Sequence, residues 1–223
     1  MNLIYLSGIA SLTIQVITAI FQVYVIKMPT PPRFYIINEL LIIDFIVQVI
    51  EGIFYIWLLT SFKTIKNVTY FRYYDWMITT PTMLITFIFY LMFLKDRENG
   101  IESNSIIDKF KDNWQLIVKV SVLDWLMLLC GYLGEKHIFS FLSTTIAGFI
   151  PFFLMFYLIY VNIASYTKTG RTLFWYFSIV WAFYGVAAIL PYRVKNTMYN
   201  ILDLFAKNFF GVFLAYVLYT ARK

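Results

Sequence analysis

Apolar residues occur in seven blocks along the chain, and short polar segments separate each block from the next. Each block is close to the roughly 20 residues that an α-helix needs to cross the hydrocarbon core of a membrane. The separating segments are rich in proline, glycine and charge, which favours loops. The pattern therefore predicts an all-α membrane protein folded as one seven-helix domain over residues 1–223. The predicted spans are residues 2–26, 33–61, 68–94, 113–134, 138–164, 171–191 and 196–220.

The composition supports a lipid bilayer as the surroundings of this chain. Hydrophobic residues make up 61% of it and charged residues only 13%, whereas soluble domains carry about a quarter charged residues. Lysine and arginine are more frequent in the loops that become cytoplasmic if the N-terminus is extracellular, so the positive-inside rule predicts that orientation. No cluster of basic and aromatic residues suits nucleic acid, and no group of residues suggests a metal site or an enzyme.

Ionisable residues remain inside the predicted spans after the flanking ones are set aside. Such a side chain costs at least about 2.5 kcal/mol in the hydrocarbon core, so each is a candidate for function. The second span holds two of them near its middle, the third two, the fourth one and the seventh two. These residues are Asp44, Glu51, Arg72, Asp75, Asp124, Asp203 and Lys207.

The segment DLFAK places Asp203 and Lys207 four residues apart, on one helix face. A desolvated lysine amine loses its proton more easily, and the neutral amine condenses with aldehydes. A buried ion pair that stabilises the bundle is the other interpretation of this pair. In the third span Asp75 is the only acid on a polar stripe that begins at Arg72. Asp75 and Asp203 could therefore flank the nitrogen of Lys207, with Arg72 balancing the negative charge.

Three segments resemble the microbial (type 1) rhodopsins, and the short loops with the triplet Asp75, Thr79 and Thr86 look like the short rhodopsins of large algal viruses. The three segments are RYYDWMITTP at 72–81, WAFYGVA at 181–187 and DLFAKNFFG at 203–211, and they occur in the order and at the spacing of that family. The resemblance implies a rhodopsin-like bundle of seven helices that binds all-trans retinal. It covers the third to seventh spans, and the first span is assigned by position alone.

The resemblance also implies roles for individual residues. Lys207 matches the lysine that forms the retinal Schiff base, Asp75 and Asp203 match its counterions, and Arg72 matches the arginine outside them. Aromatic residues match the walls of the retinal slot, and Thr80 with Asp124 matches a hydrogen-bonded pair between the third and fourth spans. The remaining residues expected around retinal are Trp76, Thr79, Met83, Met127, Gly131, Trp181 and Tyr184.

The chain departs from the proton pumps of this family on the third span. Thr86 stands eleven residues after Asp75, where such a pump carries the carboxylic acid that returns a proton. A threonine hydroxyl does not release a proton at working pH. Arg193 and Lys195 also occupy the region where pumps carry glutamates for proton release. Efficient pumping is therefore disfavoured, although a slow pump supplied by water or by Asp44 stays open.

A polar stripe on the second span suggests a different activity. Its members recur at spacings of four, three and four residues, which places them on one helix face. Facing lipid would be costly, so we expect the stripe to face the bundle interior, as a structural network or as a surface that attracts cations. The stripe consists of Asp44, Gln48, Glu51 and Tyr55, and Asn196 and Asn200 on the seventh span are expected to extend the ion path.

These observations favour a light-gated cation channel over a slow light-driven proton pump, with cations or protons as the transported species. A sensory rhodopsin that acts through a membrane partner is another alternative. A small transporter without a chromophore is disfavoured, because no internal repeat or broken span is seen. The sequence leaves the oligomeric state open, including a homo-oligomer.

Overall fold

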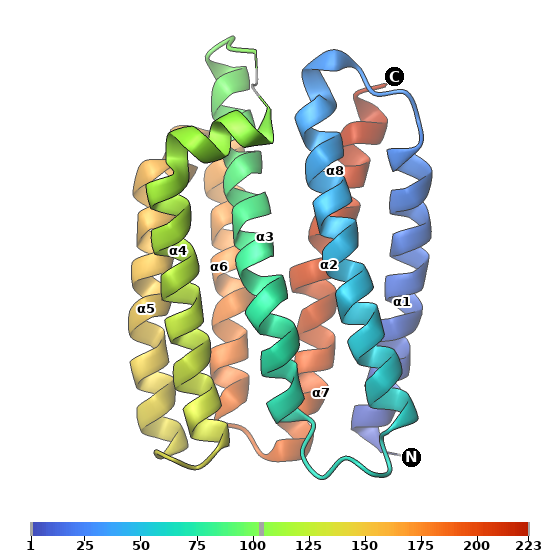
Figure 1. The fold of residues 1–223 in the computed structure, drawn as a ribbon, viewed down its shortest axis with the longest axis vertical. Helices are drawn as coiled ribbons and strands as arrows, with labels where there is room; N and C mark the ends of the chain where they lie inside the picture. The colour runs from blue at the N-terminus through green and yellow to red at the C-terminus, as the bar shows by residue number, and fades with distance from the viewer. Residues whose placement is uncertain (1, 103–104, 223) are drawn as a thin grey trace.

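The computed structural model describes residues 2–102 and 105–222. These residues form seven helical rods side by side, and the two chain termini lie at opposite ends of the bundle (Figure 1). We call these ends the N-terminal end and the C-terminal end. The elements are α1 (Leu3–Ile26), η1 (Pro32–Phe34), α2 (Tyr35–Thr60), α3 (Thr69–Glu98), α4 (Ile106–Glu135), α5 (Phe141–Asn162), η2 (Ala164–Tyr166), α6 (Lys168–Ala188), α7 (Tyr192–Asp203), η3 (Leu204–Asn208) and α8 (Phe209–Thr220), of which the last three form the seventh rod.

Helices suit this chain because a helix satisfies its backbone hydrogen bonds internally, which lipid cannot do. Among the described helices, six are long and apolar enough to cross a membrane, and α6 is not one of them. This rod begins with the polar segment KTGRT and carries several Trp and Tyr residues, which lowers its hydropathy. The prediction of a multi-pass all-α protein is confirmed, and α6 is the rod with the weakest sequence signal.

The helix ends differ from the predicted ones chiefly on either side of the charged segment near residue 100. We expected the third span to end at 94 and the fourth to begin at 113, but α3 reaches Glu98 and α4 begins at Ile106. Gly100 follows α3 with a φ of 67°, a conformation that ends helices. At the start of α4, the Ser105 hydroxyl accepts a hydrogen bond from the Asp108 backbone N–H. Both helices therefore continue into the polar segment.

Large apolar side chains cover the outside of the bundle. On α1, Ile17 and Ile20 are 62% and 66% exposed, and Phe153 on α5 is 64% exposed. The buried face of the same α1 helix is mostly polar and includes Gln15 and Gln22. Such an arrangement suits a protein that is surrounded by hydrocarbon and keeps its polar groups inside.

The seventh rod contains a π-helical turn at η3, which includes Lys207. A π-turn widens the helix locally and is found mostly at functional positions. Tyr176 on α6 donates a hydrogen bond to the backbone carbonyl of Phe205 in this turn, at 2.9 Å. The turn therefore sits at the place where the seventh rod presents its lysine to the interior.

Candidate functional site

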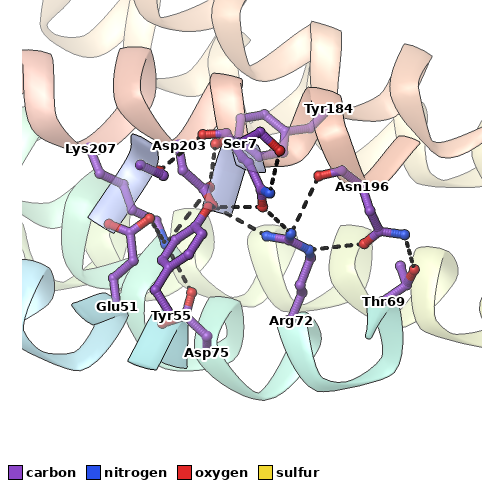
Figure 2. Close-up of polar contacts among 12 residues, drawn as sticks. Ser7, Glu51, Tyr55, Thr69, Arg72, Asp75, Tyr184, Asn196, Asp203 and Lys207 are labelled. Atoms are coloured by element: carbon purple, nitrogen blue, oxygen red, sulfur yellow. Dashed lines mark hydrogen bonds and ion pairs between the residues drawn. The ribbon is translucent and has the colours of Figure 1, made fainter. Parts of the chain in front are cut away.

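Lys207 is buried in the middle of the bundle, and its side chain points toward carboxylates (Figure 2). Among the described residues, three acids lie within 4.0 Å of its Nζ atom. The distances are 2.9 Å to Asp75 Oδ2, 3.4 Å to Glu51 Oε1 and 4.0 Å to Asp203 Oδ1. These acids come from α3, α2 and α7, so three rods meet at one cation.

Glu51 is the neighbour of Lys207 that the sequence interpretation missed. We assigned Glu51 to an ion path, yet its carboxylate lies closer to the lysine nitrogen than that of Asp203. The helical spacing on α2 predicts the buried face of Glu51 correctly, since the residue has no exposed surface. Spacing within one helix does not reveal which residues of that helix lie level with Lys207 on the seventh rod.

Asp203 is the centre of a hydrogen-bond network on the N-terminal side of the lysine (Figure 2). Tyr55 donates to its Oδ2 at 2.6 Å, and Tyr184 donates to its Oδ1 at 2.7 Å. Arg72 is fully buried and forms an ion pair with Oδ2 at 3.4 Å. Hydrogen bonds and a cation of this kind stabilise the ionised carboxylate. Asp203 is therefore held in place by residues of three other rods.

Arg72 is in turn held by the two asparagines that we expected to extend an ion path. Its Nε donates to Asn196 Oδ1 at 3.1 Å, and its Nη2 donates to Asn200 Oδ1. Asn196 also donates to Thr69 at 2.9 Å, and Asn200 donates to Ser7 on α1 at 2.8 Å. Most N–H groups of the guanidinium are therefore hydrogen-bonded. The guanidinium closes the N-terminal side of the site.

An aromatic cavity opens on the other side of Lys207, among α3, α4, α5, α6 and the seventh rod. Its empty volume is about 780 Å³, which includes space open to the surroundings. Its lining is mostly apolar and aromatic, as in pockets that bind small organic molecules. Of the residues expected around retinal, those that line the cavity are Trp76, Thr80, Met83, Met127, Gly131, Trp181, Tyr184 and Lys207.

The sequence interpretation missed four aromatic residues of this cavity: Tyr73, Phe149, Phe152 and Tyr199. A hydrophobic aromatic residue gives no signal that separates a cavity wall from ordinary core. Gly131 explains one of them, because a Cβ atom there would lie 2.5 Å from the Tyr73 hydroxyl oxygen. The missing side chain on α4 thus makes room for Tyr73.

Two residues that we expected around retinal lie behind the cavity lining. Thr79 donates its hydroxyl to the backbone carbonyl of Asp75 at 3.0 Å. Asp124 accepts a hydrogen bond from Thr80 at 2.7 Å, and Thr80 is the member of the pair that lines the cavity. Thr86 donates to its own helix, at the Thr82 carbonyl. Asp124 therefore contacts the cavity through Thr80, whereas Thr79 and Thr86 bond to their own helix.

A second polar region lies between α1, α2 and the seventh rod, and we call it the polar file. The α1 residues of this region recur at spacings of four, four, three and four, a signal that the sequence interpretation overlooked because none of them is charged. The predicted α2 stripe is buried, as expected. The polar file consists of Ser7, Ser11, Gln15, Thr18 and Gln22 on α1, Asp44, Gln48, Glu51 and Tyr55 on α2, and Asn196, Asn200, Asp203 and Asn208 on the seventh rod.

The polar file ends toward the C-terminal end at an apolar layer. Asp44 accepts hydrogen bonds from Gln22 at 2.8 Å and from Gln48 at 3.3 Å. Gly211 lies against this cluster, since a Cβ atom there would collide with all three side chains. Beyond it, a tightly packed set of side chains has no exposed surface. This apolar layer consists of Val25, Ile37, Leu40, Leu41, Leu214 and Leu218.

Comparison with protein families identifies the fold and its lineage. The family model described as "Bacteriorhodopsin-like protein" matches residues 2–221, almost the whole chain. The chain belongs to this family. Its members are retinal-binding ion transporters or photoreceptors, and the protein is accordingly a multi-pass membrane protein. No curated protein sequence matched this bacteriorhodopsin-like chain.

Solved structures of rhodopsins share the fold. The viral rhodopsin OLPVRII superposes with a TM-score of 0.84 at 23% identity, covering 98% of this chain and 99% of that one. The blue light-absorbing proteorhodopsin from Med12 gives a TM-score of 0.76 at 18% identity, covering 98% of each chain. Xanthorhodopsin, a light-driven ion pump with dual chromophore, gives 0.71 at 19% identity, covering 99% and 93%. At these identities the likeness concerns the fold of this bacteriorhodopsin-like protein.

Proposed function

We propose that this protein binds all-trans retinal through Lys207 and acts as a light-gated cation channel. The observation that carries the channel proposal is the polar file, which runs along α1 from Ser7 to Gln22. At 1.5 Å per residue this stretch is about 22 Å long, most of a hydrocarbon core of about 30 Å. A proton relay along α3 is not supported, because Thr86 takes the place of an acid there.

The residues around Lys207 fit the proposed cofactor. Lys207 lines a cavity whose walls include Trp76, Trp181 and Tyr184. Flat aromatic faces suit a conjugated polyene, and the indole nitrogen of Trp181 is buried without a hydrogen-bond partner among the described residues. Retinal, when bound there, supplies absorption of visible light and a change of shape. The carboxylates hold a positive charge on the Lys207 nitrogen.

Asp75 is the acid best placed to take a proton from the Lys207 nitrogen. Its Oδ2 lies 2.9 Å from Nζ, and its Oδ1 has no hydrogen-bond partner among the described residues. Loss of the positive charge at this nitrogen would leave Glu51 without its cation and Asp203 with Arg72 alone. Repulsion between carboxylates in a low-dielectric site is strong, so α2 and α7 are pushed apart at this level.

Opening would then require water to enter the apolar layer. Val25, Leu40 and Leu214 have no exposed surface, so this layer closes the polar file in the structure. Hydrophobic constrictions of this kind gate channels by losing and regaining water. The negative charge of Asp44 and Glu51 would favour cations over anions along the opened path. The polar file therefore provides a cation-selecting path, and the apolar layer at its end is a dry gate.

A voltage-clamp recording of retinal-loaded protein under light tests the proposal. A photocurrent whose sign reverses when the cation gradient is reversed supports a channel. A current of fixed sign at zero gradient and zero voltage would instead show a pump. Colour and a photocycle without any current would show a sensor, which needs a separate partner. The last two outcomes both overturn the channel proposal.

A slow proton pump is the second candidate, and Asp44 favours it. This carboxyl group is buried and forms no ion pair with a described lysine or arginine. It could hold a proton and supply it toward Lys207 through Gln48 and Glu51 on the same helix face. The Asp44→Asn variant should then slow the return of the proton strongly, whereas in a channel it should mainly change conductance and selectivity.

A further inference from the structure

The polar file contains a place where several oxygen atoms converge on one hydroxyl group. The hydroxyl oxygen of Thr18 lies 2.7 Å from Asn208 Oδ1, 3.1 Å from Gln48 Oε1 and 2.9 Å from the backbone carbonyl of Gln15. A hydroxyl has one hydrogen, so it can donate fully to only one of these acceptors. The amide of Gln48 is oriented by its nitrogen, which donates to Asp44. Oxygens grouped in this way are typical of a cation site.

The charges of the polar file also lack cations. Four carboxylates, those of Asp44, Glu51, Asp75 and Asp203, are buried in or beside it, and the cations among the described residues that pair with them are Arg72 and Lys207. Two negative charges are therefore uncompensated when every acid is ionised. Uncompensated charge inside a membrane protein is costly, so protons or bound cations must make up the difference.

Buried side chains next to the oxygen cluster have polar atoms without partners. Both amide atoms of Gln15, the Oε1 atom of Gln22 and the Nδ2 atom of Asn208 form no hydrogen bond with the described residues, although Gln15 and Gln22 are 2% and 0% exposed. Neutral oxygens with unused acceptor capacity thus surround one carboxylate.

We propose that a monovalent alkali cation binds between α1, α2 and η3, coordinated by Thr18 Oγ1, Gln48 Oε1 and Asn208 Oδ1. Asp44, which is hydrogen-bonded to Gln48, supplies the negative charge. One carboxylate with neutral oxygens suits a monovalent ion. The other kind of metal site, a cluster of three or more His, Cys, Asp or Glu, is not found among the described residues. The inference rests on the proposed channel, in which this site holds a permeating ion below the apolar layer.

Thermal unfolding of the purified pigment in the dark tests the site without light or current. The protein is heated in sodium chloride and, at equal ionic strength, in N-methyl-D-glucamine chloride, whose cation is too large for the site. A bound ion stabilises the folded state by mass action, so Tm should be higher in sodium by about 2–4 °C. Equal Tm values in the two salts would overturn the proposal.

Two variants and a control locate the effect. Thr18→Val removes one oxygen at constant shape, and Asp44→Asn removes the charge, so each should abolish the difference between the two salts. Thr86→Val removes a buried hydroxyl that bonds only its own helix, and it should keep the difference. A sodium effect that survives both Thr18→Val and Asp44→Asn would place the ion elsewhere and overturn the assignment.

Infrared spectra of the wild-type protein decide the matter if the variants do not fold. An ionised Asp44 beside a cation lacks the carbonyl band of a protonated carboxylic acid. Other buried acids such as Asp124 contribute equally in both salts, so we expect the difference spectrum between N-methyl-D-glucamine and sodium to show this carbonyl band. A difference spectrum without the band would overturn the proposal.

The outcomes separate this site from the channel itself. Sodium-dependent stability without a photocurrent would support the site and reject the channel. A photocurrent whose sign reverses with the cation gradient, in a protein whose Tm does not depend on sodium, would support the channel and reject the site.

Discussion

Two regions of the interior meet at Lys207 and differ in almost every respect. The aromatic cavity, bounded by α3 to α6, has walls of Trp, Tyr, Phe, Met and Gly. The polar file, bounded by α1, α2 and the seventh rod, contains amides, hydroxyls and carboxylates. The first region can hold an apolar molecule in one orientation, and the second can hold charge and water. Lys207 contacts both, because it lines the cavity and its nitrogen pairs with Asp75 and Glu51.

The difference between the two regions shows how a change of shape in the aromatic cavity could affect the polar file. Packed aromatic rings such as Trp76, Tyr184 and Tyr199 are rigid, so a change of shape in the cavity is not absorbed there. The polar file is held by hydrogen bonds and ion pairs that depend on one positive charge. Moving or neutralising that charge therefore affects the polar file more than the cavity. Substitutions placed on one side or the other can test this asymmetry.

The largest expected effect comes from the residue that joins the two regions. Lys207→Ala removes the amine, so the protein should form no visible pigment when all-trans retinal is added, a complete loss measured by absorption spectroscopy. Lys195→Ala is the control, because Lys195 is also buried but pairs with Glu135 outside the cavity. It should keep the visible band. A retinal imine in Lys207→Ala would refute the assignment of the attachment site.

The next effect comes from the acid nearest to the nitrogen. Asp75→Asn removes the charge at 2.9 Å, and Glu51→Gln removes the one at 3.4 Å. A nearby carboxylate stabilises the positive charge on the nitrogen in the ground state, so its removal should shift absorption to longer wavelength. We expect the larger shift and the greater loss of photocurrent, of the order of tenfold, for Asp75→Asn. Equal effects of the two variants would show that the acids share the charge evenly.

Much of this site could be predicted from the sequence, because its key residues lie on single helices at fixed spacing. Asp203 and Lys207 are one helical turn apart, and Arg72 and Asp75 share a stripe, so their common faces follow from helix geometry. The seven rods follow equally well from the apolar blocks. These features depend on local structure and on the thickness of a membrane.

Features that depend on contacts between helices could not be predicted in the same way. The approach of Glu51 to Lys207 depends on the axial offset between α2 and the seventh rod, which no helical spacing contains. The π-turn at η3 has no sequence signal of its own, since packing decides where a helix widens. The α1 stripe follows from the spacing of Ser11, Gln15 and Gln22, but uncharged polar residues cost less to bury than charges and so give a weaker signal of function.

A pair of identical substitutions sharpens the comparison of the two regions. Gly211→Ala places a methyl group against Gln22, Asp44 and Gln48 in the polar file. Gly185→Ala places one 2.6 Å from Phe149 at the cavity wall. Overpacking costs about 1–3 kcal/mol in either place. We expect Gly211→Ala to reduce the photocurrent several-fold with little change in colour.

The expected result for Gly185→Ala is the reverse, a shifted absorption band with the ion selectivity of the wild type. Spectra and voltage-clamp currents are measured on both variants. The division into two regions would be refuted if each variant changed colour and current to the same extent. Because the added group is the same, any difference must come from the place where it is added.

The smallest effect concerns the border of the cavity on α3 and α4. Thr80→Val removes the hydroxyl that donates to Asp124 at 2.7 Å and leaves a carboxyl group, which has no exposed surface, without that donor. A buried polar group that loses its partner costs about 1–3 kcal/mol, which should lower Tm by several degrees. Thr79→Val is the matched control, because the Thr79 hydroxyl donates to a backbone carbonyl that already belongs to a helix. Thermal unfolding of the two pigments should therefore show the larger loss for Thr80→Val, and equal losses would mean that the contact with Asp124 adds nothing to the stability of this border.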